Sequence, residues 1–291
     1  MTIYSEIAKN KRRTWLLLII FSAVVMAIGW FWGESSGFGY RGLITAFLFS
    51  SVSAAFSYFA SDKVALATHG AKKVNKQDAP RYYRIVENLT LGSGLPLPEL
   101  YVIPSRALNA FATGRNPEHA SVAVTSGLLQ RLDNQELEGV LAHELSHIKN
   151  YDIRLMTVVV VLVGAVGILS SWFRRSIFYG SRRRNEKNSG GLLALIGLVL
   201  LLVAPIVATL IKLAISRRRE FLADTSAAYI TRYPEGLASA LEKISKRSRL
   251  ENASEATAHL FIDNPFRGSA FANLFSTHPP AEERISRLRQ M

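Results

Sequence analysis

The sequence predicts a mainly α-helical membrane protein in which two transmembrane helical hairpins alternate with soluble parts built from helices and short strands. Three observations predict this fold class. Four uncharged stretches are each about 20 residues long, the length of helix that crosses a bilayer. Basic residues cluster beside these stretches. The remaining segments have the composition and hydrophobic period of ordinary globular structure.

The four apolar stretches predict four membrane helices. The first and second stretches are bordered by aromatic residues that suit a membrane interface. The first stretch is too long for a cleavable signal sequence and is interpreted as a retained anchor. The stretches span 14–33, 42–61, 155–173 and 189–211, and they divide the chain into an N-terminal tail with the first hairpin (1–61), a soluble α+β part (62–154), a second hairpin (155–215) and a C-terminal helical part (216–291).

The distribution of basic residues predicts the orientation in the membrane. The N-terminal tail carries four basic residues, whereas the loop 34–41 carries one, so the tail and the soluble parts are expected in the cytoplasm. The loop 174–188 is strongly basic, and a full crossing by the second hairpin would place it outside the cytoplasm, against the positive-inside rule. Whether the second hairpin spans the membrane therefore stays open. Basic residues beside apolar spans favour anionic lipid headgroups as a partner. No zinc finger or recognition helix accompanies them, so nucleic acid is not expected.

Within the soluble parts, turn residues and hydrophobic spacing predict the elements in order. Pro80 begins an amphipathic helix that ends at a Gly-Ser-Gly turn, and short alternating runs predict a small sheet. Asp133, with Glu136 three residues later, is a capping box that opens a helix. The predicted strands are 99–103, 108–112 and 121–125, and the predicted later helices cover 217–230, 234–248 and a short segment after Pro279 and Pro280.

The helix after Asp133 carries a metal-binding motif, His143-Glu144-Leu145-Ser146-His147. Residues four apart lie on one helix face, so both imidazoles can bind one ion while Glu144 reaches a water beside it. The chain has no cysteine, so the other ligands of a metal site must be histidines or carboxylates. The alternative to a metal site is that His143 and His147 are surface residues on a solvent-exposed face of the helix.

A catalytic zinc site usually has three protein ligands, so a third must come from elsewhere in the chain. The spacing of Glu220 and Asp224 places both on one helix face, with Glu220 able to bind the ion and Asp224 able to hold a ligand imidazole. A salt bridge to nearby arginines explains that pair equally well. The candidates left open by sequence are Asp152, Glu220, Asp224, His259 and His278.

Four separated motifs stand in this chain: His143-Glu144-Leu145-Ser146-His147, Arg219-Glu220-Phe221-Leu222-Ala223-Asp224, Asn109-Ala110-Phe111-Ala112-Thr113-Gly114 and Ser276-Thr277-His278-Pro279-Pro280. Together with the apolar hairpins they resemble the HtpX family of bacterial membrane zinc metallopeptidases, which is related to the CAAX prenyl proteases. The resemblance covers nearly the whole chain. It implies a gluzincin-type α+β metallopeptidase domain with one Zn²⁺ per chain, bound by His143, His147 and Glu220, with Glu144 as general base.

Further roles follow from the resemblance and from the local sequence. His278, held before two prolines, is the candidate that stabilises the oxyanion of the reaction. Asn109 and Ala110 lie on a predicted strand whose edge could bind an extended peptide. Asp152 and Asp224 are candidates that support the ligands. Three other histidines, His69, His119 and His259, lack a partner at ligand spacing and are expected at the surface.

The expected function is therefore membrane-protein quality control. The chain is expected in the bacterial inner membrane as a multi-pass endopeptidase, with its active site on the cytoplasmic side and unfolded or membrane-protein substrates. Two alternatives are a processing protease with one specific substrate and a non-catalytic scaffold stabilised by zinc. A transporter is less compatible with spans that hold no charged residue before Lys212.

Overall fold

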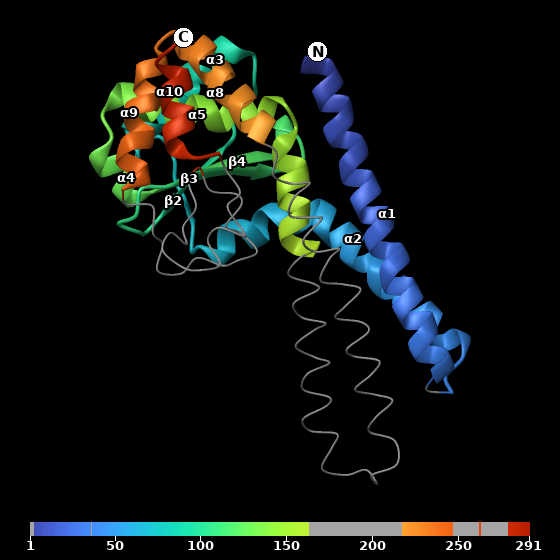
Figure 1. The fold of residues 1–291 in the computed structure, drawn as a ribbon. Helices are drawn as coiled ribbons and strands as arrows, with labels where there is room; N and C mark the ends of the chain where they lie inside the picture. Colours follow the sequence, from blue (N-terminus) through green and yellow to red (C-terminus); the bar gives the residue numbers. More distant parts are fainter. Residues whose placement is uncertain (1–2, 36, 163–216, 247–261, 263–278) are drawn as a thin grey trace.

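The computed structural model of the chain describes residues 3–35, 37–162, 217–246, 262 and 279–291. Figure 1 shows two long helices that extend away from a rounded part made of a sheet and several helices. The long helices are α1 (Ile3–Ser35) and α2 (Tyr40–Thr68). Of the predicted second hairpin, only 155–162 lies within the described residues, where the chain is helical. The second hairpin therefore stays a prediction.

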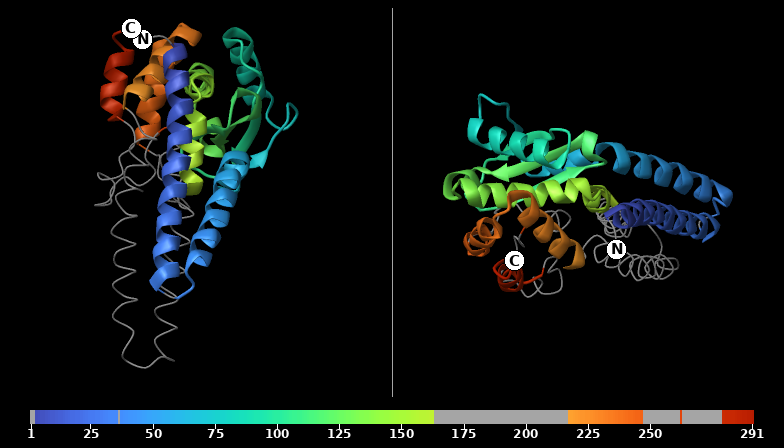
Figure 2. Two further views of the ribbon diagram at one scale, coloured as in Figure 1. Left: turned by 90° about the vertical axis from the view of Figure 1, so that its right-hand side faces the viewer. Right: turned by 90° about the horizontal axis from the view of Figure 1, so that it is seen from above.

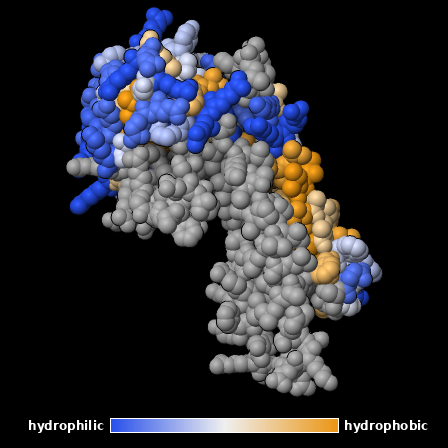
Figure 3. Space-filling model, in the orientation of Figure 1, coloured by the Kyte–Doolittle hydropathy of each residue, from blue (hydrophilic) through white to orange (hydrophobic). Residues whose placement is uncertain are grey.

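Helices α1 and α2 have the length and composition of membrane spans. The candidate spans, Ile7–Phe31 and Tyr40–Thr68, are 25 and 29 residues long, and their apolar parts have mean hydropathies of 2.3 and 1.6. Apolar side chains face outward, as the orange surface in Figure 3 shows. Exposed examples are Ile19 (63%) and Val52 (68%). The helices approach closely at Gly33 and Gly42, where an added Cβ on Gly33 would collide with Gly39 O. Small residues allow such backbone contact between membrane helices.

Both long helices extend beyond the apolar stretches from which they were predicted. Helix α1 begins at Ile3 rather than at 14, and α2 continues to Thr68 rather than ending at 61. Charged residues such as lysine and arginine are good helix formers, so a change of polarity does not end a helix. The helix α2 therefore crosses the predicted boundary between the first hairpin and the soluble part.

The sheet has four strands in the order β1-β2-β4-β3, with β2 and β4 parallel and the other neighbours antiparallel. Three were predicted, and β3 begins two residues later than expected. The fourth was missed because it consists of two exposed lysines. The strands are β1 (Lys72–Lys73), β2 (Glu99–Ile103), β3 (Ala110–Gly114) and β4 (Ala120–Thr125).

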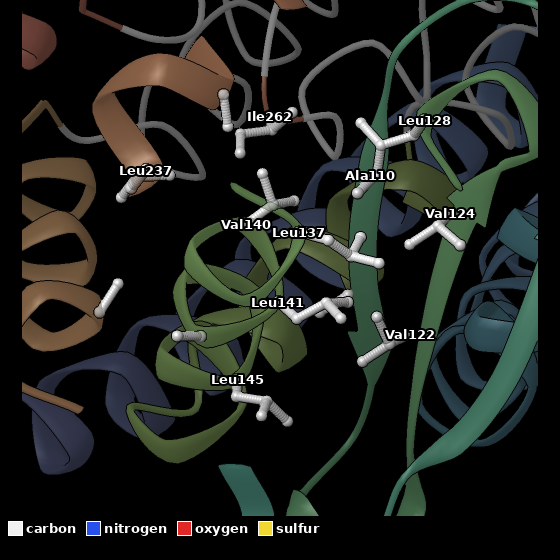
Figure 4. Close-up of a cluster of buried hydrophobic side chains, with 14 of the residues drawn as sticks. Ala110, Val122, Val124, Leu128, Leu137, Val140, Leu141, Leu145, Leu237 and Ile262 are labelled. Carbon is white, nitrogen blue, oxygen red and sulfur yellow. The ribbon is translucent and has the colours of Figure 1, made fainter. Parts of the chain in front are cut away.

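The two faces of the sheet pack against different helices. One face packs against α3 (Pro80–Ser93) and α5 (Asn134–Lys149), and Figure 4 shows Leu137, Leu141 and Leu145 of α5 turned toward strand residues of this core. The other face packs against the end of α2 and the helical residues 152–162. The sheet therefore packs directly against the same helices that continue into the apolar segments.

Helix α5 is covered on its second side by the C-terminal helices, which share its hydrophobic core. Figure 2 shows these helices across α5 from the sheet when the molecule is seen from above. The contact is close, since an added Cβ on Gly139 of α5 would collide with the backbone of Leu237. The remaining elements are η1 (Pro117–His119), α4 (Ser126–Arg131), α8 (Arg217–Thr231), α9 (Pro234–Ser245) and α10 (Ala281–Leu288).

Candidate metal centre

The centre is built on α5, which the capping box starts as predicted. The Asp133 carboxylate accepts a hydrogen bond from Glu136 N, and the Glu136 carboxylate accepts one from Asp133 N, both at 2.9 Å. The helix then carries His143, Glu144 and His147 into the interior, where they are 1%, 2% and 4% exposed. The alternative of two surface histidines is therefore wrong.

The carboxylate of Glu220, on α8, faces the Nε2 atoms of both imidazoles. His143 Nε2 and His147 Nε2 lie 3.2 Å apart, and each lies 3.6 Å from a different carboxylate oxygen of Glu220. These donor atoms all lie within 4.8 Å of one another. Of the five candidates left open by sequence for the third ligand, Glu220 is the one that completes this triangle within the described residues.

The triangle has the size and chemistry of a metal site. Ligands at about 2.0–2.1 Å from a tetrahedral zinc ion lie about 3.3 Å from one another, close to the observed separations. Each Nδ1 atom faces a carboxylate, so in the neutral imidazoles the proton lies on Nδ1 and the Nε2 lone pair is directed toward the Glu220 carboxylate. Three electron-rich groups facing one point are stabilised by a cation, and imidazole with carboxylate suits a divalent transition metal.

Asp224, one turn after Glu220, holds the first imidazole. Its Oδ1 lies 2.9 Å from His143 Nδ1. The carboxylate also accepts hydrogen bonds from Arg284 of α10, at 2.9 Å from Nε and 2.7 Å from Nη2. The alternative partners expected from sequence were the arginines at the start of α8, but the observed partner lies on the last helix. Arg284 Nη1 is also 3.7 Å from Glu220 Oε2.

Asp152 holds the second imidazole in the same way. Its Oδ2 lies 3.1 Å from His147 Nδ1. The Asp152 side chain is 1% exposed, so this contact lies in the interior. Its other oxygen, Oδ1, lies 3.6 Å from Arg219 Nη1 and accepts a hydrogen bond from Asn10 Nδ2 at 2.7 Å. A carboxylate on the far nitrogen of a ligand imidazole fixes its tautomer and ring orientation.

The two imidazoles differ in their protonation. Burial lowers the pKa of His143 to about 4, despite the hydrogen bond with Asp224. Burial also opposes protonation of His147, but the hydrogen bond with Asp152 and the charge of Glu220 raise its pKa to about 9. Burial opposes ionisation of Asp224 as well, yet the charge of Arg284 and its hydrogen bonds hold the pKa at about 2. The raised pKa of His147 favours a proton on this imidazole in the metal-free chain, and a metal ion bound at Nε2 would replace that proton.

Strand β3 packs against α5, and the two predicted peptide-binding residues lie at its start, Asn109 directly before the strand and Ala110 as its first residue. Asn109 is fully buried, and its Oδ1 accepts a hydrogen bond from Ala110 N at 3.1 Å. The Ala110 carbonyl accepts a hydrogen bond from Ile262 N at 3.1 Å. The chain therefore already uses one acceptor on the outer edge of β3. Asn109 and Ala110 as peptide-binding residues stay a prediction.

The expectations for the histidines outside the motif can be compared with their positions in the structure. His278 and His259 lie outside the described residues, so the proposed oxyanion role of His278 stays a prediction. His119 is exposed, as expected. His69 was expected at the surface but is 8% exposed, because it ends α2 where that helix packs on the sheet, beside Phe111.

Sequence reasoning missed Arg284, one of the largest fully buried side chains among the described residues. A signal was present in the spacing of the last helix. Ala281, Arg284 and Leu288 follow helical spacing and are all buried, so the arginine lies on the inward face among apolar residues. A charged residue on such a face needs a buried partner of opposite charge.

Comparisons with known proteins agree with this geometry. The model of Peptidase family M48 matches residues 76–291. "Protease HtpX homolog" of Tropheryma whipplei is 47% identical, covering 99% of this chain and 98% of the relative. Proteins of the same description from Dictyoglomus thermophilum (46%; 100% and 95%) and Pyrococcus furiosus (47%; 96% and 95%) are similarly close.

One solved structure resembles the fold along most of the chain. The crystal structure of S. mikatae Ste24p aligns with a TM-score of 0.51 at 18% identity. The alignment covers 95% of this chain but 66% of that protein. At this identity the similarity concerns the fold alone.

Proposed function

The chain belongs to the HtpX proteases of peptidase family M48, and from this we propose that it is an integral-membrane zinc endopeptidase that degrades misfolded or damaged membrane proteins. The family makes it a metallopeptidase, and its two apolar helices agree with a membrane protein. One observation carries the proposal: His143, His147 and Glu220 converge from two helices on one point, with Glu144 buried beside them.

We assign the metal to zinc, one ion per chain, with His143, His147 and Glu220 as its ligands. Two imidazoles and one carboxylate are a common ligand set of catalytic zinc in peptidases, and three protein ligands leave a position for water or substrate. Zinc bound there would acidify a water molecule and polarise the scissile carbonyl. Three converging donors among the described residues support a catalytic site rather than a purely structural one.

The residues of the chain then have separate tasks. Glu144 accepts a proton from the attacking water and passes it to the leaving amine nitrogen. Asp224 and Asp152 keep protons on the Nδ1 atoms of the two imidazoles, so that both Nε2 lone pairs face the metal position. His278, by its place in the sequence, would donate a hydrogen bond to the carbonyl oxygen as negative charge develops on it.

The substrate would bind as an extended strand along the outer edge of β3. Backbone hydrogen bonds to a strand edge are made by any sequence, which suits a protease that removes damaged proteins of many kinds. Because Ile262 N already bonds the Ala110 carbonyl, a peptide that pairs at Ala110 would have to displace that contact. The basic N-terminal tail supports placing this site at the cytoplasmic surface, beside anionic headgroups.

The test compares the wild-type chain with Glu144→Gln, both purified in detergent with zinc, on an unfolded protein such as casein. We expect Glu144→Gln to cleave more slowly by a factor of about 100 or more and to keep one zinc ion. Glu138→Gln, on the same helix but outside the centre, is the matched control and should cleave as wild type. Equal rates for Glu144→Gln and wild type would refute the assignment. Cleavage of one lipidated peptide but no unfolded protein would favour a processing protease.

A further inference from the structure

The first membrane helix contacts the metal centre through one buried side chain. Asn10 of α1 is 1% exposed, although it lies among the basic residues of the N-terminal tail. Its Nδ2 donates hydrogen bonds to Asp152 Oδ1 at 2.7 Å and to Asn150 O at 3.0 Å. Thr14, one turn later, donates to Asn10 O at 2.9 Å. Asn10 is thus held by its own helix and directed at the segment that follows α5.

This contact continues directly to a proposed metal ligand. Asp152 accepts from Asn10 on Oδ1 and lies 3.1 Å from His147 Nδ1 with Oδ2. The two oxygens of one carboxylate therefore face the membrane helix and the imidazole. Since a carboxylate is planar, fixing Oδ1 also fixes the direction in which Oδ2 meets the imidazole.

Asn10 also closes the end of the metal-binding helix. The last carbonyls of a helix have no partner within it. Asn150 ends α5, and its carbonyl accepts from Asn10. Asn10 Oδ1 has no hydrogen-bond partner among the described residues. The amide is therefore oriented so that both contacts use its N–H groups.

The backbone between these two contacts is strained. Tyr151 has φ of 59°, in the left-handed region that residues other than glycine rarely adopt. Such a conformation persists where the surroundings hold it. Lys11, next to Asn10, places Nζ 4.2 Å from the centre of the Tyr151 ring. Two neighbouring residues of α1 thus hold the turn that brings Asp152 back to His147.

Apolar packing places α1 where these contacts form. Leu17, Leu18 and Phe21 of α1 pack against Leu155, Val158, Val159 and Leu162 of the helix that begins at 152. The left view of Figure 2 shows α1 alongside this segment. The apolar contacts and the hydrogen bonds of Asn10 therefore belong to one interface, between α1 and residues 150–162.

We propose that Asn10 is a positioning residue of the metal centre, through which the first membrane helix orients Asp152 and so His147. The proposal rests on the proposed ligand role of His147. It assigns α1 a part in metal binding in addition to membrane anchoring. Loosening α1 from residues 150–152 should therefore weaken the hold on the metal while leaving the substrate edge at β3 intact.

The test is Asn10→Asp in the full-length chain, kept in lipid-containing micelles. The carboxylate has the shape of the amide but no N–H, so it faces two acceptors that it cannot bond. We expect zinc affinity, measured by titration with a chelator, to fall by up to about 10-fold, the lower end of the effect of losing the direct partner of a ligand, because Asp152 itself stays in place. With cobalt in place of zinc, the visible spectrum should change. At saturating zinc, kcat should fall, and KM for casein should stay within about twofold, since Asn10 contacts Asn150 and Asp152 rather than the edge of β3 proposed to bind the substrate.

Two further variants separate positioning from general packing. Ser57→Ala removes a buried hydrogen bond of 3.2 Å from α2 to Val158 O, on the same helix as Asp152 but away from the centre, and should leave zinc affinity unchanged. The double variant Asn10→Asp with Asp152→Asn places an N–H on residue 152 opposite the new carboxylate. It should recover part of the affinity that Asn10→Asp loses.

Zinc binding by His147→Ala tests the ligand assignment separately from the positioning role of Asn10. If His147→Ala keeps stoichiometric zinc, the ligand assignment itself fails. If His147→Ala loses zinc while Asn10→Asp resists the chelator as wild type does, only the positioning role is refuted. An equal loss in Ser57→Ala would refute it as well. Should Asn10→Asp not accumulate in the membrane, Asn10→Ala, which introduces no charge, is judged by the same affinity criterion.

Discussion

Arg284 donates two hydrogen bonds to the carboxylate of Asp224, one from Nε at 2.9 Å and one from Nη2 at 2.7 Å. Asp224 Oδ1 in turn lies 2.9 Å from His143 Nδ1. A side chain from the last helix thus orients an imidazole on α5, although the two residues are 141 positions apart. All three side chains are at most 3% exposed, so α10 is part of the centre without supplying a proposed ligand.

Replacing this arginine should destabilise the fold. Arg284→Met leaves Asp224 buried without its cationic partner, and breaking a buried ion pair by removing one member typically costs about 3–5 kcal/mol. The thermal unfolding midpoint of the purified chain should fall accordingly. Arg289→Ala, which removes exposed pairs with Glu235 and Glu242, is the control and should shift the midpoint far less. Equal shifts would show that the buried pair of Arg284 and Asp224 contributes no more to the stability of the fold than an exposed ion pair does.

Removing the metal should lower stability through the proposed ligands. An ion that binds only the folded chain stabilises it by about 4 kcal/mol at a thousandfold excess over Kd. A chelator should therefore lower the unfolding midpoint of the wild type, and added zinc should restore it. His143→Ala should not respond to either, whereas His119→Ala, an exposed histidine bonded to Asn116, should behave as wild type. A chelator response that survives in His143→Ala would contradict the site.

Membrane orientation can be measured cleanly because the chain has no cysteine. Phe38→Cys places a thiol in the loop between α1 and α2, and Gln77→Cys places one on the exposed segment before α3. From the excess of basic residues in the N-terminal tail, an impermeant maleimide should label residue 38 in intact cells and residue 77 only after the membrane is opened. The reverse pattern would place the metal centre outside the cytoplasm.

The close approach of α1 and α2 should be intolerant of larger residues. Gly33→Ile forces side-chain atoms into the backbone of Gly39 and Gly42, an overpacking that typically costs about 1–3 kcal/mol. The unfolding midpoint in detergent should fall. Val52→Ile, which enlarges an exposed lipid-facing side chain on α2, should have little effect. A midpoint unchanged by Gly33→Ile would mean that the two helices do not pack closely in the membrane.

Elements specified by neighbouring residues could be predicted well. The helix after Asp133 depends on a capping box and a local apolar period, and α5 begins and runs as those features require. The strands 99–103 and 121–125 also follow from local alternation. The two-residue strand β1 could not be predicted, because Lys72 and Lys73 are extended only through pairing with β2. Likewise, β3 begins two residues later than predicted: Asn109 N donates a hydrogen bond to the Thr125 hydroxyl, and the Asn109 side chain accepts one from Ala110 N.

Three features could be predicted from residues at most a few turns apart: the apolar character of the first hairpin, the metal-binding helix, and the placement of two histidines on one of its faces. Other features became evident from the folded chain: Glu220 completes the triangle, Arg284 and Asn10 reach the carboxylates behind the imidazoles, and His69 is buried. These facts depend on which helix faces pack together. That choice is made by the burial of apolar surface across the whole chain, and a buried charge finds its partner only after the packing has brought the two together.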